Sequence, residues 1–395
     1  MTDQIDRILS DTELRQDMQA WRHDLHRHPE LGFEESRTAD RVADLMQQWG
    51  IEVHRGLGGT GVVGVIRGEQ GFGRRIGIRA ELDALPLEEA NGFTHASIHP
   101  GVMHACGHDG HAAMLLGAAR CLAADRRFSG TVHVIFQPAE ELLASGARRM
   151  LADGLLDHFP CDAIYAVHNF PSLAPGTAGI RTGPITAAVD NFEILIRGRG
   201  GHGGMPHLCI DPVIPACECV LALQRIVSRS IDATDACVLS ATMLQGGDAP
   251  NVVPDMVRIG GTVRTLREEV RDHAETELRR IAGAVALAHR CEAEVRYVRG
   301  HPATTNSPRE ASLAAAALER VLGHGQVDTQ FGPVMGGEDF SYFLQQMPGA
   351  YAVLGQGGSA MIHNPSYDFN DAILPLGAAF FVAVVHAELS GTHAP

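Results

Sequence analysis

The stretch Thr131-Val132-His133-Val134-Ile135-Phe136-Gln137-Pro138-Ala139-Glu140-Glu141 is an apolar, β-branched run that gives way to a proline and two glutamates. The run over 131–136 predicts a buried strand, because apolar residues occupy both of its faces. We expect a helix to begin at Pro138, since proline suits the first turn of a helix. A buried strand followed by a helix is typical of α/β domains.

The same alternation extends along the chain on both sides of this stretch. Strands alternating with helices indicate an α/β domain with a mostly parallel sheet. The pattern changes near residue 185 and returns after about residue 305, so we assign residues 1–184 and 300–395 to this main domain. Its further expected strands are 61–66, 75–79 and 163–167, and its expected helices are 11–49, which Gly50 would stop, and 111–124.

Residues 185–299 form a second predicted domain. Residues 191–197 alternate like a half-exposed strand. The β-α-β-β-α-β order that follows is that of a split-βαβ, ferredoxin-like domain, so we predict a smaller α+β domain inserted into the main one. Its remaining elements are expected at 212–230 (helix), 237–244 and 256–265 (strands), 268–288 (helix) and 292–298 (strand).

The composition excludes several classes of protein. At 395 residues the chain is too long for one simple core, and its 45% apolar and 20% charged residues are typical of a soluble globular protein. A formal net charge of −15 disfavours nucleic acid, because binding phosphate requires an excess of Lys and Arg. We expect no membrane-spanning run and no secretory signal, hence a cytoplasmic protein whose eight cysteines are thiols.

Metal-binding residue types gather in four places. Cys106 and His108 lie two residues apart on a glycine-bearing turn, so a thiolate and an imidazole can reach one metal ion or two adjacent ones. Glu140 and Glu141 suit a division of labour in which one binds metal and the other handles protons. The other two places are a histidine after the strand predicted at 163–167 and a histidine in a loop near the C-terminus, namely His168 and His363.

The positions of these residues matter as much as their types. Asp83, Glu140, Glu141 and His168 each fall just past a predicted strand, and ligands of open α/β sheets bind at the carboxyl ends of strands. Singly, a histidine can face solvent, a glutamate pair at a helix start can interact with the helix dipole, and a cysteine can be a small buried hydrophobe. Only the combination indicates a metal site. We interpret three other histidines as helix-surface residues: His23, His26 and His28.

Together these residues resemble the M20 metallopeptidase family, in the branch of hippurate hydrolases, N-acyl-amino-acid amidohydrolases and auxin-conjugate hydrolases. The resemblance runs nearly end to end, and the segment from Met103 through Cys106 and His108 to His111 is highly specific for this branch. The other matching segments are 26–35, 79–86, 137–141, 200–207, 251–254, 261–265, 336–340 and 363–364.

The resemblance implies a two-metal site with a general base. Glu140 is similar to the base that takes a proton from the attacking water, and Asp83 is similar to the acid that orients a metal ligand. A thiolate with imidazoles suits zinc, although manganese, cobalt or nickel fit the same ligands. Two divalent metal ions would be bound by Cys106, His108, Glu141, His168 and His363.

The inserted domain is similar to a lid that also joins subunits, so the resemblance implies a homodimer or a higher homo-oligomer. His202 resembles the histidine that stabilises the oxyanion, usually in the partner subunit's site. Asn251 and Arg264 match positions that would hold the substrate carboxylate, for which a guanidinium offers a fitting planar fork. Arg264 can equally be a surface strand residue of an acidic protein.

The resulting hypothesis is metal-dependent hydrolysis of small, hippurate-like N-acyl or N-aroyl amino acids to a carboxylic acid and a free amino acid. A dipeptidase or carboxypeptidase could use the same metals, but a free α-amino group on the substrate needs an acidic partner that the sequence does not place. A catalytically silent metal-binding protein is a further alternative, and the retention of Glu140 argues against it. Departures from the family at Leu142-Leu143, Glu81 and Gly204 leave the acyl group open.

Overall fold

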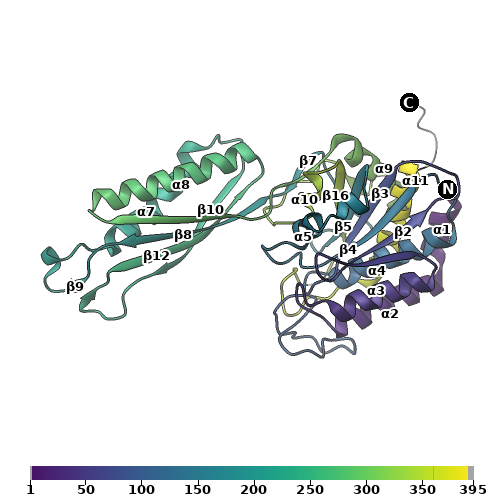
Figure 1. Ribbon diagram of the computed structural model, residues 1–395, viewed down its shortest axis with the longest axis horizontal. Helices are drawn as coiled ribbons and strands as arrows, with labels where there is room; N and C mark the ends of the chain where they lie inside the picture. The colour runs from purple at the N-terminus through teal and green to yellow at the C-terminus, as the bar shows by residue number, and fades with distance from the viewer. Residues whose placement is uncertain (1, 359, 390–395) are drawn as a thin grey trace. The chain divides into compact units, whose positions relative to one another are not determined.

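The computed structural model of the protein describes residues 2–358 and 360–389, and the chain divides into two units that each have a core of their own (Figure 1). The second unit is an insertion, which the chain enters after residue 185 and leaves before residue 305. The first unit comprises Met1–Ile185, Thr305–Gly332 and Asp339–Pro395, and the second comprises Thr186–Thr304 and Pro333–Glu338.

An eight-stranded sheet forms the centre of the first unit, in the order β1-β2-β4-β3-β5-β16-β6-β15. The neighbouring strands β4, β3, β5 and β16 run parallel to one another, and β6 runs parallel to β15. The pairs β1–β2, β2–β4 and β6–β16 are antiparallel. The sheet is therefore mixed, with a parallel centre, where the sequence predicted a mostly parallel one. The strands are Glu52–Leu57 (β1), Gly61–Arg67 (β2), Arg75–Glu81 (β3), Thr131–Gln137 (β4), Ala163–Phe170 (β5), Ala178–Gly179 (β6), Val327–Asp328 (β15) and Gly349–Gly355 (β16).

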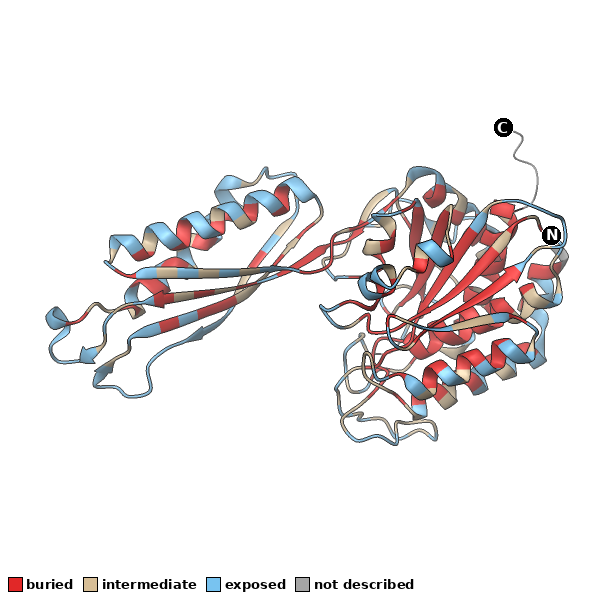
Figure 2. Cartoon of the chain, in the orientation of Figure 1, coloured by how far each residue is buried: buried red, intermediate tan, exposed pale blue. Residues whose placement is uncertain are grey.

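Apolar residues on both faces of these strands bury the sheet between two layers of helices (Figure 2). In β2, Val62 and Ile66 point into one core while Val63 and Val65 point into the other, as the two-residue period of a strand requires. One layer contains Thr2–Ser10 (α1), Thr12–Arg27 (α2), Ser36–Gln48 (α3), His108–Ala124 (α4), Pro308–Leu322 (α9) and Leu374–Leu389 (α11), and the other contains Gly146–Ala152 (α5), Leu155–His158 (α6) and Ser341–Leu344 (α10).

Helix α11 belongs to the interior of the first unit. The segment Asp371–Leu389, 19 residues that include α11, is long and apolar enough to cross a membrane by length and composition alone. The expectation that no apolar run reaches this length was therefore wrong. However, 83% of its apolar stretch is buried inside the protein, and Phe380 and Phe381 are fully enclosed in the larger core. A helix that is apolar all round is what a buried core position requires.

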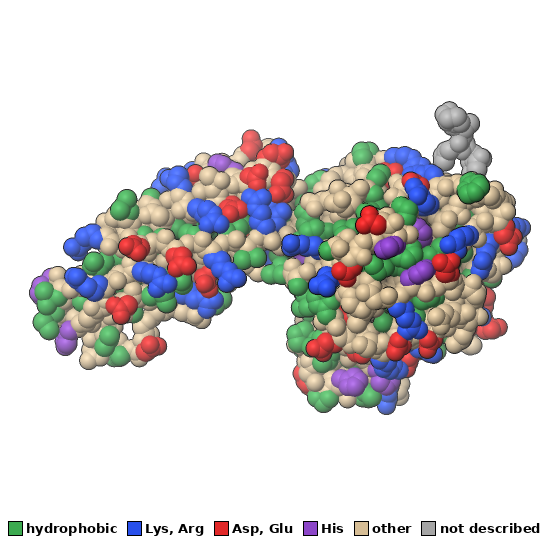
Figure 3. Space-filling model, viewed as in Figure 1, with side chains coloured by type: hydrophobic (Ala, Val, Ile, Leu, Met, Phe, Trp, Pro, Cys, Tyr) green, Lys and Arg blue, Asp and Glu red, His purple; other side chains and the backbone are tan. Residues whose placement is uncertain are grey.

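The second unit contains a four-stranded antiparallel sheet in the order β10-β12-β8-β13. Helices α7 and α8 pack on this sheet, and Phe192, Ile194 and Ile196 of β8 form a core with them. On the face drawn in Figure 3, acidic and basic side chains are interspersed, so the net negative charge is not gathered in one patch there. The elements are Ala188–Arg197 (β8), Val213–Arg225 (α7), Cys237–Gln245 (β10), Met256–Thr265 (β12), Glu268–Ala288 (α8) and Glu292–Arg299 (β13), with a small two-stranded sheet of Gly201–His202 (β9) and Val252–Val253 (β11). Another two-stranded sheet consists of Gly183–Thr186 (β7) and Thr304–Asn306 (β14), and each of these strands includes a boundary between the units.

Two elements of the first unit differ from the prediction. The helix expected over 11–49 is two helices, because α2 ends at Arg27, shortly before Pro29, and a residue that precedes proline disfavours the helical conformation. No helix begins at Pro138 either, and α5 begins only at Gly146. Between them the backbone takes positive φ angles of 49° at Ala139 and 54° at Ser145, which a right-handed helix does not accommodate.

Candidate metal centre

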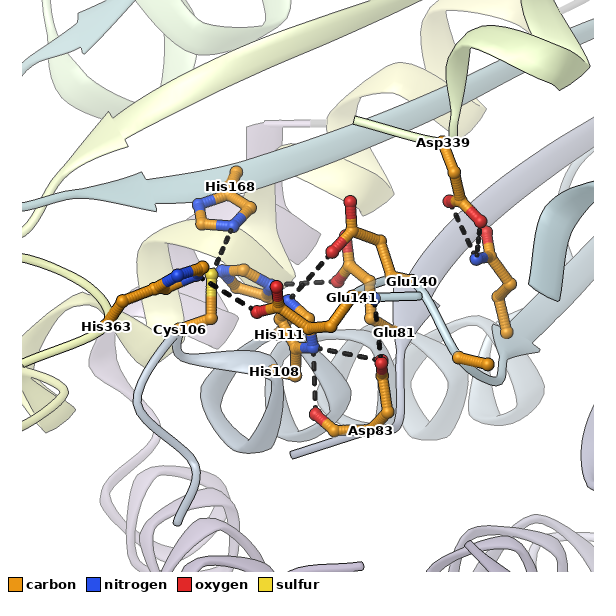
Figure 4. Close-up of polar contacts among 12 residues, drawn as sticks. Glu81, Asp83, Cys106, His108, His111, Glu140, Glu141, His168, Asp339 and His363 are labelled. Carbon is orange, nitrogen blue, oxygen red and sulfur yellow. Dashed lines mark hydrogen bonds and ion pairs between the residues drawn. The ribbon is translucent and has the colours of Figure 1, made fainter. Parts of the chain in front are cut away.

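Six side chains that the sequence singled out meet at one edge of the sheet in the first unit (Figure 4). The parallel strands β3, β4 and β5 end at this edge, so residues beyond their carboxyl ends are brought together. The six are Cys106 and His108 at the start of α4, Glu140 and Glu141 in the loop after β4, His168 on β5 and His363 in a loop after β16.

A first group of possible metal ligands consists of Cys106, His108 and His168. One ligand atom from each lies within 4.8 Å of the others, and Cys106 Sγ is 3.4 Å from His168 Nε2. Cys106 and His108 are buried. A thiol and two imidazoles so close together can bind a single zinc-like ion.

Cys106 also belongs to a second group, with Glu141 and His363, whose ligand atoms likewise lie within 4.8 Å of one another. His363 Nε2 is 3.1 Å from Glu141 Oε1. The loop that carries His363 is fixed to the turn of Cys106, because the His363 N–H donates to the carbonyl of Ala105 at 2.7 Å. Since the two groups share Cys106, together they can hold two adjacent ions.

Hydrogen bonds determine which nitrogen two of the histidines turn toward these groups. His108 Nδ1 lies 2.9 Å from the carbonyl oxygen of Asp83 and 3.2 Å from its Oδ1. His168 Nδ1 lies 2.7 Å from the carbonyl oxygen of Asn169. A carbonyl oxygen only accepts, so Nδ1 carries a proton in both rings. Nε2 is then the atom available to a metal, as is usual for metal-binding histidines.

The residues fit a pair of cations on electrostatic grounds. Burial, reinforced by Glu141, Glu140 and Glu81, raises the pKa of the Cys106 thiol well above its usual value. Burial lowers the pKa of His108, but Asp83, Glu81 and Glu141 outweigh it and raise the pKa to about 10. Buried His108 Nε2 makes no hydrogen bond to any residue that the structure describes. Sulfur, imidazole and carboxylate donors in an excess of buried negative charge are suited to divalent transition metals.

Glu140 lies beside both groups. Its Oε2 is 3.9 Å from His108 Nε2, and one of its oxygens shares a group of possible ligands with His108 and Glu141. The Asp83 carboxylate contacts both groups: its Oδ1 lies next to His108 Nδ1, and its Oδ2 accepts the Glu141 N–H at 2.9 Å. The two glutamates therefore lie next to each other at the same centre without being at a helix start, which removes the interaction with a helix dipole as their explanation.

The structure adds His111 and Glu81 to the surroundings of the centre. Both are buried, and His111 Nδ1 lies 2.9 Å from Glu81 Oε2 while His111 Nε2 lies 2.8 Å from Asn169 Oδ1. Burial raises the pKa of Glu81, but Arg79 and His111 outweigh it and hold the pKa well below its usual range. The spacing of His108 and His111 by three residues at a helix start places both on one helical face, and this signal could have identified His111.

His26 was interpreted as a helix-surface residue, and that interpretation is wrong. Its ring is fully buried, with Nδ1 2.9 Å from Asp109 Oδ2 and Nε2 3.1 Å from Glu89 Oε1. Because Asp109 follows His108 directly, this contact anchors the start of α4 from behind the metal centre. The spacing of apolar residues cannot reveal a buried ion pair, because a histidine counts as polar whether it is exposed or buried beside a carboxylate.

The three remaining predicted residues, His202, Asn251 and Arg264, belong to the second unit. β9 and β11 bring the first two together, because Val252 pairs with His202 and the Gly203 N–H donates to the carbonyl of Asn251 at 2.8 Å. Arg264 is half-buried on β12, where its backbone pairs with β10 and β8, and its side chain has neither a hydrogen bond nor an ion pair with any residue that the structure describes. Burial lowers the pKa of Arg264 although Asp190 opposes this, so the guanidinium would gain from an anionic partner.

Comparison with known proteins gives consistent matches over nearly the whole chain. The family model of peptidase family M20/M25/M40 matches residues 77–387. The chain is 37% identical over 369 residues to a hippurate hydrolase of Campylobacter jejuni, covering 93% of this chain and 96% of that protein. It is also 37% identical over 366 residues to thermostable carboxypeptidase 1 of Saccharolobus solfataricus, covering 90% and 91%. A solved dinuclear metal-binding peptidase of the M20 family from Bacillus subtilis matches with a TM-score of 0.84 and 34% identity, covering 95% of this chain and 98% of that one.

Proposed function

The chain belongs to peptidase family M20/M25/M40, and from this premise we propose that it hydrolyses the amide bond of small N-acyl or N-aroyl amino acids to a carboxylic acid and a free amino acid. The observation that carries the proposal is the convergence of two groups of possible metal ligands on Cys106, with Glu140 beside them. The alignment with a relative named hippurate hydrolase, across 96% of its length, supports this substrate class.

Each subunit would hold two divalent metal ions. One would be bound by Cys106, His108 and His168, and the other by Cys106, Glu141 and His363. Zinc suits a thiolate with imidazoles, and manganese, cobalt and nickel fit the same donors. Ions bound there supply Lewis acidity, which makes water a stronger acid and polarises the amide carbonyl.

Glu140 would act as the general base. Its carboxylate lies next to the ligand atoms of His108 and Glu141, so it can take a proton from a water held at the centre and return it to the leaving amine nitrogen. Asp83 would orient His108 through Nδ1 and Glu141 through its N–H. A pure metal-binding protein needs no additional carboxylate at this position, which favours an enzyme.

The layout of the second unit supports a role for a second subunit. Arg264 lies near the end of β12. His202 follows Arg197, the last residue of β8, and Arg197 pairs with Met256 at the start of β12. His202 and Arg264 therefore belong to opposite ends of this sheet. At about 3.3 Å per residue, the span from Met256 to Arg264 is roughly 25 Å. A small substrate cannot bridge that span within one unit. We therefore propose that His202 stabilises the oxyanion in another copy's site, that Asn251 helps to hold the substrate carboxylate there, and that the protein is at least a homodimer.

Arg264 would bind the carboxylate of the amino-acid part of the substrate. A half-buried guanidinium that forms no hydrogen bond or ion pair with the described residues matches a bidentate carboxylate in shape and charge. The second unit, with its β-α-β-β-α-β order and the sheet order β10-β12-β8-β13, would then be a ferredoxin-like lid and dimerisation domain, and the first unit the catalytic domain.

Two leucines next to the centre favour an apolar acyl group. Leu142 and Leu143 follow Glu141 directly, and each remains 40% exposed. Leu142 packs closely over Gly32, where an added Cβ would lie only 2.9 Å from its Cδ1. Exposed apolar side chains beside buried charges are typical of a substrate-binding wall. We propose that they contact the acyl part of the substrate, so that benzoyl groups are preferred to acetyl groups.

A substrate panel tests the proposal. The protein is assayed with hippurate, N-acetyl amino acids and dipeptides, before and after removal of metal with a chelator and after addition of zinc, manganese or cobalt. We expect hydrolysis of the N-acylated substrates, its loss with the chelator and its return with metal. The relative named carboxypeptidase keeps a metallo-carboxypeptidase or dipeptidase as the second candidate. Cleavage of dipeptides alone would establish that candidate and refute the first.

A further inference from the structure

The Glu140 loop, defined here as residues 138–145, is strained at both of its ends. Ala139 has a φ of 49° and Ser145 a φ of 54°, in the left-handed region that residues with a Cβ rarely occupy. Such strain persists only where the surrounding structure enforces it, and it is concentrated at functional sites. The loop carries both Glu140 and Glu141, so what enforces its shape also places these two side chains.

Glu35 holds the first end of the loop. Its Oε1 accepts the N–H of Ala139 at 2.7 Å, and its Oε2 accepts the hydroxyl of Thr60 at 2.5 Å. The side chain is fully buried just before α3, far from the loop in sequence. A buried carboxylate is costly unless hydrogen bonds satisfy it, and one of the bonds that satisfies Glu35 is to the strained residue.

Asp339 holds the second end of the loop. It is fully buried, and its Oδ2 accepts the hydroxyl of Ser145 at 2.8 Å and the N–H of Ala147 at 3.0 Å. Asp339 is itself fixed from the sheet, since Arg79 Nη2 lies 2.9 Å from its Oδ1 and Gln137 Nε2 lies 2.8 Å from the same oxygen. This acid therefore ties the loop to the ends of β3 and β4.

The two ends of the loop also meet each other. The N–H of Gly146 donates to the carbonyl of Ala139 at 3.0 Å, and a Cβ at Gly146 would lie 1.6 Å from the carbonyl oxygen of Pro138. Only glycine permits that approach. Because the base of the loop is closed in this way, a shift at either end displaces the whole loop, and with it Glu140 and Glu141.

We infer that Glu35 and Asp339 are positioning residues that lock the strained Glu140 loop and so hold Glu140 and Glu141 at the metal centre. The inference rests on the proposed function for the roles of Glu140 and Glu141. The lock itself is a property of the loop, with consequences for backbone exchange and metal affinity that do not require turnover. We class neither acid as a catalytic residue, because Glu35 acts through the N–H of Ala139 and Asp339 through the hydroxyl of Ser145 and the N–H of Ala147.

The first test compares Glu35→Ala with Glu35→Gln in the metal-loaded protein. The amide oxygen of glutamine can still accept the Ala139 N–H, whereas alanine removes the acceptor. In Glu35→Ala we expect at least about tenfold faster hydrogen exchange in peptides covering residues 138–147, together with roughly 10- to 100-fold weaker metal binding and a similar loss of kcat at little change in KM. Glu35→Gln should restore most of each loss.

The second test separates positioning from stability. Ala139→Gly removes the penalty of the left-handed conformation, so its melting temperature should stay close to that of the wild type while loop exchange rises and kcat falls. Arg290→Gly is the matched control, because Arg290 has a φ of 62° on the exposed surface of the second unit. This control should leave kcat, metal affinity and loop exchange unchanged.

These outcomes are decisive in both directions. Wild-type loop exchange and metal affinity in Glu35→Ala would overturn the lock, as would full activity in Ala139→Gly. If the wild-type protein hydrolyses no N-acyl amino acid, the proposed function fails, while exchange and metal affinity still decide the lock. An Asp339→Asn variant that folds should match Glu35→Ala in exchange and metal affinity, and its matching the wild type instead would remove Asp339 from the account.

Discussion

The two oxygens of the Asp83 carboxylate serve two different segments: Oδ2 accepts the N–H of Glu141 at 2.9 Å, and Oδ1 lies 3.2 Å from Nδ1 of His108. Asp83 is buried directly after β3, so its own position is set by the central sheet. One side chain thus orients two proposed metal ligands that lie far apart in sequence. It contacts His108 Nδ1 and the Glu141 N–H rather than the atoms proposed to bind metal.

Replacing Asp83 should weaken metal binding without unfolding the protein. Asparagine keeps one acceptor but turns an NH₂ group toward either the His108 N–H or the Glu141 N–H, which cannot accept it. We expect Asp83→Asn to lower metal affinity by about 10- to 100-fold, measured by titration of the metal-free protein. Asp44→Asn, at an exposed acid of α3, is the control. Equal affinity in both variants would show that Asp83 has no orienting role.

The two ligand groups make separable predictions for metal content. His168→Ala should lose the ion of one group and His363→Ala the ion of the other, so each variant should retain about half of the bound metal. Cys106→Ala should lose most of both, because the two groups share that sulfur. Elemental analysis after dialysis measures this directly. Identical metal content in all three variants would contradict the assignment of two adjacent sites.

The exposed leucines of the Glu140 loop predict the preference for the acyl group. A double variant with Leu142→Ala and Leu143→Ala removes most of the proposed apolar wall. The ratio of kcat/KM for N-benzoyl over N-acetyl amino acids should fall by at least about tenfold, since apolar groups in a pocket contribute discrimination of this size. Activity on the acetyl substrate should change little. An unchanged ratio would place the acyl group elsewhere.

The guanidinium of Arg264 predicts a dependence on the substrate carboxylate. In Arg264→Lys the planar fork is lost and the positive charge stays, so KM for hippurate should rise by about 10- to 100-fold, which corresponds to the loss of one good charged hydrogen bond. The same variant should treat hippuramide, which lacks the carboxylate, like the wild-type protein. If KM rises equally for both substrates, Arg264 does not read the carboxylate.

The buried ion pair of His26 predicts a stability that depends on pH. Burial lowers the pKa of His26, but Asp109 and Glu89 outweigh it and raise the pKa to about 9. Because this folded value lies above the unfolded value of about 6.5, the charged ring stabilises the protein fully below pH ~6.5, and this contribution is lost as pH rises through about 9. The difference in free energy of unfolding between wild type and His26→Gln should therefore shrink from pH ~6 to pH ~10 in denaturant titrations. A difference independent of pH would mean that folding does not change the pKa of the ring.

Much of the fold follows from sequence patterns that have a direct physical cause. β12 and α8 begin and end at the residues expected, Met256–Thr265 and Glu268–Ala288, because alternation and helical spacing are unambiguous where one face is exposed. The buried strands of the first unit stand out because both of their faces are apolar. The antiparallel edges of that sheet were not foreseen, since strand direction depends on how connections run rather than on the residues of a strand.

The site was predictable where ligands cluster locally and not where distant segments meet. Cys106, His108, Glu140 and Glu141 stand out through their residue types and short spacing. The contact of Glu35 with Ala139 spans 104 residues, and that of Asp339 with Ser145 spans 194, so no local pattern marks either acid as a holder of the Glu140 loop. Pro138 misled for a related reason: tertiary hydrogen bonds outweighed its preference for a helix start.

The turnover of Glu140→Gln, measured on an N-acyl amino acid in protein whose metal content has been determined, tests the central claim most directly. Glutamine preserves the size of the side chain and removes its ability to take a proton. We predict that kcat falls by about 10²- to 10⁴-fold while both metal ions stay bound. Turnover near the wild-type rate with the same metal content would contradict the assignment of Glu140 as the general base and the mechanism built on it.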